Sequence, residues 1–61
     1  MPSDVRFPQV RRMPALAGGY RLDRIRGSHH VFEKPGVLPV VIPVHRGRVK
    51  YVYVRKIQKL Q

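Results

Sequence analysis

Turns that contain glycine or proline divide this 61-residue chain into short segments. The clearest turn signals are Gly18-Gly19, Gly27-Ser28, Lys34-Pro35-Gly36 and Arg46-Gly47-Arg48. Between them lie segments with alternating polarity and many β-branched or aromatic residues, which are typical of strands. We therefore expect three strands, over about residues 20–26, 29–33 and 37–45, joined as an antiparallel meander.

Two prolines constrain the third predicted strand. Pro39 and Pro43 have the same parity, so their missing amide hydrogens belong on one side of that strand. A strand of this kind suits the edge of a sheet, with its donor-poor side facing solvent. We expect residues 38, 40, 42 and 44 to pair inward.

Apolar residues recur at helical spacing near both ends of the chain. The first predicted helix covers about residues 5–17, and we expect it to be irregular because an interior Pro14 costs about 3 kcal/mol. The last predicted helix covers about residues 52–60, after extended chain to about Tyr51. A strand over residues 49–54 is the alternative, since valine and tyrosine dominate that stretch.

These elements predict an α+β fold in a single domain over residues 1–61. A chain of this length supports one domain at most. The order helix, three strands, helix predicts a three-stranded antiparallel sheet with the helices on one face and the other face free.

The chain is strongly basic, with 13 Lys and Arg against 3 Asp and Glu and a formal net charge of +10. Such a surface attracts nucleic acid, anionic lipid or an acidic protein, unless it serves solubility alone. No apolar run approaches the ~18 residues of a membrane span, so we expect no membrane partner. Six cations near strand ends and loops are expected to contact an RNA backbone without reading bases: Arg21, Arg24, Arg26, Arg46, Arg48 and Lys50.

The segment Gly27-Ser28-His29 places a titratable side chain directly after a tight turn, where a strand begins. An ordinary histidine titrates near neutral pH, which suits a general base or acid. We predict that His29 is a catalytic or ligand-binding residue; the alternative is a strand-end histidine that bonds a backbone carbonyl. His30 points the other way on an alternating strand and is expected to pack. His45 is a candidate helper.

The same residues argue against a metal site or another cofactor. Adjacent His29 and His30 diverge on a strand, and Asp4, Asp23 and Glu33 stand at no recognised ligand spacing. The chain has no cysteine for a disulfide or a thiolate ligand.

The sequence Gly-Ser-His-His-Val-Phe over residues 27–32, preceded by Gly19–Arg26 and followed by Val41–His45, resembles the HicA toxins. These are small mRNA interferases of bacterial and archaeal type II toxin–antitoxin pairs. The resemblance covers about residues 18–61 and departs from the family where Pro8 and Pro14 interrupt the first helix.

That resemblance implies a fold like the double-stranded-RNA-binding domain and a cytoplasmic enzyme that cleaves mRNA without a cofactor. It implies that His29 is catalytic, with Gly27 and Ser28 as its supporting turn. It also implies a HicB-type antitoxin as the protein partner, which covers the toxin and blocks its histidine.

RNA carries its own nucleophile, the ribose 2′-hydroxyl. His29 would take its proton while arginines stabilise charge on the phosphate, leaving a 2′,3′-cyclic phosphate. Hydrolysis by an activated water is the alternative route. Two other function classes also fit the sequence: an RNA-binding module without catalysis, and a basic protein that acts by binding an acidic partner.

Overall fold

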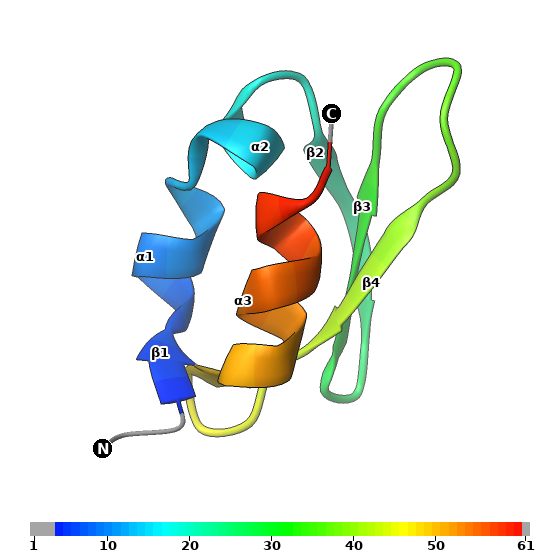
Figure 1. The fold of residues 1–61 in the computed structure, drawn as a ribbon. Helices are drawn as coiled ribbons and strands as arrows, with labels where there is room; N and C mark the ends of the chain where they lie inside the picture. Colours follow the sequence, from blue (N-terminus) through cyan, green and yellow to red (C-terminus); the bar gives the residue numbers. More distant parts are fainter. Residues whose placement is uncertain (1–3, 61) are drawn as a thin grey trace.

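The computed structural model describes residues 4–60; the ends of the predicted domain, residues 1–3 and 61, lie outside the described residues. Figure 1 shows how the elements follow one another. In order they are β1 (Asp4–Arg6), α1 (Phe7–Arg11), α2 (Pro14–Ala17), β2 (Arg21–Arg26), β3 (His29–Glu33), β4 (Val40–Pro43), β5 (Arg48–Lys50) and α3 (Tyr51–Gln58). Within residues 4–60, no helix is long and apolar enough to cross a membrane.

The three central strands form an antiparallel sheet in the order β2-β3-β4, as the turn signals predict. A two-residue turn joins Arg26 to its cross-strand partner His29. Gly27 in this turn has φ 59°, the left-handed value required at the first central position of a type II′ turn, and glycine adopts it without strain. Further along, a bulge between Leu22 and Arg24 shifts the register of β2 against β3.

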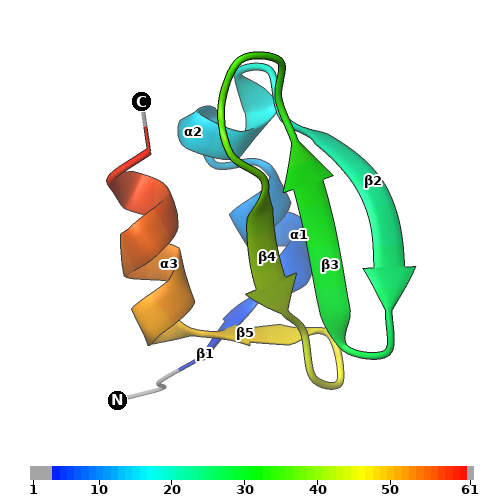
Figure 2. The same ribbon diagram turned by 90° about the vertical axis from the view of Figure 1, so that its right-hand side faces the viewer.

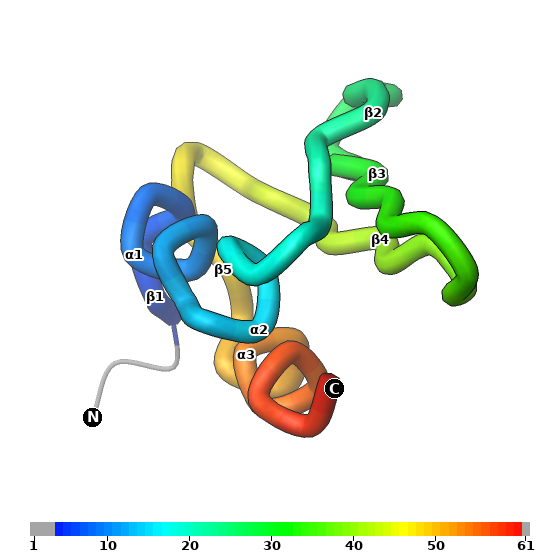
Figure 3. Tube along the Cα trace, turned by 90° about the horizontal axis from the view of Figure 1, so that it is seen from above, coloured from blue at the N-terminus to red at the C-terminus, as the bar shows by residue number. Residues whose placement is uncertain are grey.

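All three helices lie on one face of this sheet, and the opposite face is uncovered (Figures 1 and 3). Phe32 and Ile42 point toward the helices, with 2% and 1% of their surface exposed. Val41 points to the uncovered face and is 48% exposed. Because alternate residues of a strand point to opposite faces, this pattern confirms the predicted α+β fold with its helices on one side.

The strand β4 is shorter than the predicted strand over residues 37–45. Residues 34–39 form a turn and loop, and prolines at both ends of the extended stretch limit the ladder. The predicted inward pairing is confirmed for residues 40, 42 and 44, because the Val44 amide donates to the Ser28 carbonyl at 2.7 Å, toward β3, whereas Leu38 lies in the loop before the strand. Neighbouring odd-numbered residues, Pro39 and Pro43 among them, therefore direct their backbone outward.

The predicted helix over residues 5–17 is in fact two short helices, α1 and α2, with a break at Arg12-Met13. Pro14 causes the break because its ring disfavours a helical conformation in the residue before it. Met13 is accordingly extended, with φ −59° and ψ 137°, and Pro14 begins α2. The start of the predicted helix is instead the strand β1.

A second, two-stranded ladder joins β1 to β5. Its antiparallel pairs are Asp4 with Lys50, Val5 with Val49, and Arg6 with Arg48. Arg48–Lys50 is extended, as predicted for the chain before the last helix, but its pairing with β1 was not predicted. The alternative strand over residues 49–54 is wrong beyond Lys50, because α3 begins at Tyr51 and ends at Gln58.

The core draws on both ladders and all three helices. Its buried side chains are Val10, Leu16, Phe32, Ile42, Val49, Val54 and Ile57. The small ladder and the main sheet thus share one core, and the N-terminal elements are part of it. A chain of this size buries only about 60% of its unfolded surface, so each of these side chains matters to stability.

Two neighbouring positions on β4 test this division of the faces. We expect Ile42→Val to lower the free energy of unfolding by about 1 kcal/mol, because it removes a methylene group from a filled core. Val41→Thr on the uncovered face is the control and should change it by less than about 0.5 kcal/mol. Urea denaturation of both variants measures this difference; equal effects would contradict the assignment of the faces.

Candidate functional site

His29 occupies the first position of β3 and faces the uncovered side of the sheet. Its cross-strand neighbours are Arg26 on β2 and Pro43 on β4, and directly opposed side chains have Cβ atoms about 5 Å apart. The residue is exposed. Its imidazole makes no hydrogen bond, ion pair or ring contact with any residue from 4 to 60. An imidazole beside a guanidinium is therefore available to a ligand on this face.

His30 points to the helix side, as predicted, and is half-buried. Its ring lies 4.7 Å from the ring of Phe7, centroid to centroid, at an interplanar angle of 56°. Its Nδ1 lies 3.3 Å from the Ser28 carbonyl oxygen, within hydrogen-bond distance. The structural role that was the alternative for His29, bonding a backbone carbonyl, thus falls to His30.

The predicted supporting turn, Gly27 and Ser28, positions both histidines. Adding a Cβ at Gly27 meets no atom within 4 Å, so glycine is needed there for its positive φ and not for space. The contribution of Ser28 comes from its backbone carbonyl, which accepts from the Val44 amide and faces the His30 ring. This carbonyl ties β3 to the chain that follows β4.

The six predicted RNA-binding cations are all exposed, but the structure separates them. Arg24 and Arg26 pair with Val31 and His29 across β2 and β3 and share the uncovered face. The Arg24 guanidinium lies 3.2 Å from the Asp23 carboxylate, an exposed ion pair. Arg21 lies at the far end of β2, opposite Glu33.

The remaining cations belong to β5 and the turn before it: Arg46, Arg48 and Lys50. That turn lies at the same end of the molecule as the turn between β2 and β3 (Figures 1 and 2). His45 starts this turn and bridges to Arg48 through backbone bonds of 2.9 Å in both directions. Between the described side chains of His45 and His29 there is no hydrogen bond or ring contact, so the predicted helper role gains no support.

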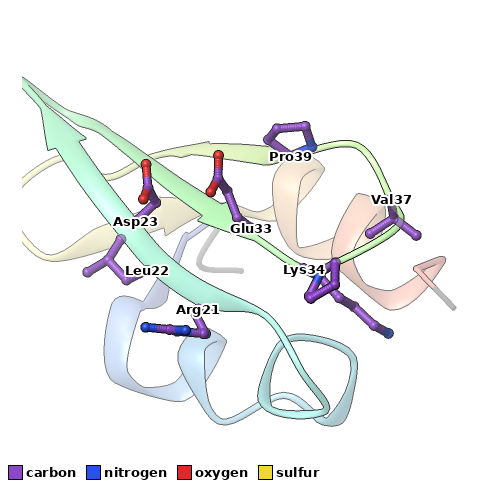
Figure 4. Close-up of a pocket in the computed structure, with 8 residues that line it drawn as sticks. Arg21, Leu22, Asp23, Glu33, Lys34, Val37 and Pro39 are labelled. Carbon is purple, nitrogen blue, oxygen red and sulfur yellow. The ribbon is translucent and has the colours of Figure 1, made fainter.

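A hollow of about 470 Å³ lies at the opposite end of the sheet from His29. Asp23 and Glu33 line it, and their carboxylates project from the same side of the β2–β3 pair (Figure 4). Glu33 is at the end of β3, about 13 Å from His29 at roughly 3.3 Å per residue. Arg21 and Lys34 line the same hollow, so it carries as many cations as carboxylates and is not an acidic patch.

Several features of this site have no local sequence signal. The approach of Asp23 to Glu33 depends on the bulge in β2, and the contact of Phe7 with His30 depends on how α1 packs. Pro43 was noted in the sequence only as an edge residue, yet it is the direct neighbour of His29. Within residues 4–60, no group of three His, Asp or Glu side chains is arranged to hold a metal ion.

Comparison with known proteins identifies a family. A family model described as "HicA toxin of bacterial toxin-antitoxin" matches residues 15–60 of the 61. The matched segment contains the main sheet, the Gly27–His29 turn and α3, and it leaves β1 and α1 outside. No curated protein and no solved structure matches the chain significantly.

Replacing each histidine separately tests their division of roles. We expect His30→Ala to lower the free energy of unfolding by about 1–2 kcal/mol, because a hydrogen bond and a ring contact are lost. His29→Ala, which removes an exposed side chain, should change it by less than about 0.5 kcal/mol. Urea denaturation measures the free energy of unfolding of both variants. A larger loss of stability in His29→Ala than in His30→Ala would show that His29, and not His30, is the structural histidine.

Proposed function

The chain belongs to the HicA family of bacterial toxin–antitoxin toxins, and on this premise we propose that it is an RNA endonuclease with His29 as its general base. One observation carries the assignment to this residue. Of two adjacent histidines, His30 is engaged by Phe7 and the Ser28 carbonyl, whereas His29 is exposed beside Arg26. The family is generally one of ribonuclease toxins, so the exposed histidine is the natural place for the chemistry.

The proposed reaction uses the nucleophile within RNA. The neutral His29 imidazole takes the proton of a ribose 2′-hydroxyl, and that oxygen attacks the adjacent phosphorus as the P–O5′ bond breaks. The leaving 5′-oxygen takes a proton from solvent, which reaches this open face. The products are a 2′,3′-cyclic phosphate and a 5′-hydroxyl. The proposed reaction requires no oxidant, reductant or cofactor.

The two arginines on the same face support this reaction electrostatically. Arg26 is the direct neighbour of His29, and Arg24 is the next residue on β2 that faces the uncovered side. As phosphate passes to a phosphorane its oxygens gain negative charge, which a positioned guanidinium stabilises. Because the Arg24 guanidinium is ion-paired with the Asp23 carboxylate, we assign the larger contribution to phosphorane stabilisation to Arg26.

We further propose a HicB-type antitoxin as the neutralising protein partner. Membership of a toxin–antitoxin family implies such a partner in general. The uncovered face of the sheet offers both an exposed histidine and a positive charge, so a protein with acidic groups that covers this face would block RNA access.

Removing the His29 imidazole tests the proposal. Purified protein is incubated with 5′-labelled single-stranded RNA in excess EDTA, beside His29→Ala. We expect the wild type to cleave and the variant to lose roughly 10²- to 10⁴-fold in rate, the usual contribution of a general acid or base. Unchanged circular dichroism and unfolding midpoint of the variant show that the loss is chemical.

His45→Ala is the matched control, since it removes another exposed imidazole at the same end of the molecule. The cleavage rate of this variant should fall by less than about tenfold, well below the usual effect of removing a general base. A salt-sensitive gel shift with intact RNA would instead identify an RNA-binding module, and absence of both binding and cleavage would favour a basic partner-binding protein.

The substrate itself distinguishes transesterification from hydrolysis by water. A 2′-deoxy substitution at the cleaved nucleotide should abolish cleavage there, because the nucleophile is gone, while binding persists. Mass spectrometry of the wild-type products should find 2′,3′-cyclic phosphate ends. Cleavage of the deoxy substrate at an undiminished rate would show that water is the attacking group.

A further inference from the structure

The strand β1 brings an arginine from outside the family match to the basic turn before β5. The matched segment begins at residue 15, whereas Arg6 lies in β1, opposite Arg48 in the ladder. At the other end of the same ladder the charges are complementary, Asp4 opposite Lys50. Side chains alternate along a strand, so both charged pairs share the face opposite the buried Val49.

A pair of like charges is an unfavourable choice for this position. Like charges directly opposite on neighbouring strands destabilise a ladder, whereas opposite charges stabilise it. Arg6 and Arg48 are both exposed, and neither makes an ion pair with a carboxylate in residues 4–60. Among the described residues, these two neighbouring guanidiniums therefore have no direct carboxylate partner.

The adjoining turn adds a third guanidinium at a second unfavourable position. Backbone bonds in both directions between His45 and Arg48 close a two-residue turn, with Arg46 at φ 53° and Gly47 at φ 76°. Positive φ at both central residues is the type I′ pattern, which favours asparagine, aspartate or glycine. Arg46 is the one described residue other than glycine with positive φ, and a side chain there carries backbone strain.

The turn is also held firmly against the N-terminal elements. The Phe7 amide, at the start of α1, donates to the Gly47 carbonyl at 2.8 Å. The same Phe7 contacts the ring of His30. The three arginines are thus presented on a fixed backbone that is connected to the hairpin carrying His29.

We propose that Arg6, Arg46 and Arg48 form an anchor for the phosphodiester backbone of single-stranded RNA, separate from the cleavage site; this rests on the proposed function. Guanidiniums pair with phosphate oxygens in two-point geometry, and a bound polyanion removes the repulsion between them. The anchor lies at the same end of the molecule as the turn that carries His29 (Figure 2).

The anchor predicts opposite effects on the stability of the free protein and on RNA binding. Removing two of its charges relieves repulsion, so the unfolding midpoint in urea should rise. The same change removes phosphate contacts, so RNA affinity should fall. A residue that serves folding alone would not give this combination.

The experiment uses His29→Ala protein, which leaves the RNA intact, and adds Arg6→Gln with Arg48→Gln. The control adds Arg11→Gln with Arg12→Gln, which removes the same charge from exposed residues at the end of α1. Fluorescence anisotropy with a labelled mixed-sequence RNA measures Kd between 50 mM and 200 mM salt. We expect the anchor variant to weaken binding on the order of tenfold, and to reduce the log–log salt slope by about 1.4, or roughly 0.7 per lost contact.

The control should show a smaller change in slope and no rise in urea midpoint. In a background that retains His29, the two anchor substitutions should raise KM and leave kcat within about twofold, because uniform binding energy is removed. Equal losses of affinity in the two double variants, or an unchanged midpoint in the anchor variant, would overturn the anchor alone. Failure of the His29→Ala parent to bind RNA would overturn the proposed function as well.

Discussion

The register of the β2–β3 hairpin decides which of two adjacent histidines is available for chemistry. Because side chains alternate along a strand, a slip of one residue would turn His29 inward and His30 outward. The left-handed Gly27 fixes the turn, and the Ser28 carbonyl accepts from the Val44 amide and lies within bonding distance of the His30 ring. Packing of His30 on Phe7 supports the same register from the helix side. His30 therefore packs against Phe7, and the His29 side chain remains exposed.

The sequence predicts the parts of the fold that depend on local constraints. Turn signals predict the three-stranded meander because glycine and proline restrict or free the backbone at their own positions. Pro14 predicts the irregular first helix for the same reason. The sequence does not predict the ladder between β1 and β5, because the two strands come from opposite ends of the chain. Three residues of strand carry too little periodicity to distinguish them from the end of a helix.

In the candidate site too, features set by contiguous residues are predictable from the sequence, and features set by long-range packing are not. His29 is recognisable from Gly-Ser-His because the turn and the histidine are contiguous, and the opposite direction of His30 follows from strand alternation. The position of Arg6 opposite Arg48 and the contact of Phe7 with His30 both depend on long-range packing. Sequence therefore identifies the proposed catalytic residue more readily than the surface that surrounds it.

Exposure of His29 bears on how the proposed chemistry would be achieved. A catalytic group in a buried pocket is preorganised by protein walls that exclude water, whereas this imidazole lies on an open sheet beside a single neighbouring guanidinium. In water the field of one arginine is strongly weakened, so an RNA strand that covers the face must itself exclude solvent before that charge stabilises a transition state effectively. A bound backbone held at a second point would keep the scissile phosphate over His29 long enough for that to happen. Basic residues away from the histidine would then contribute through RNA binding, because they lengthen the time for which the strand covers this face.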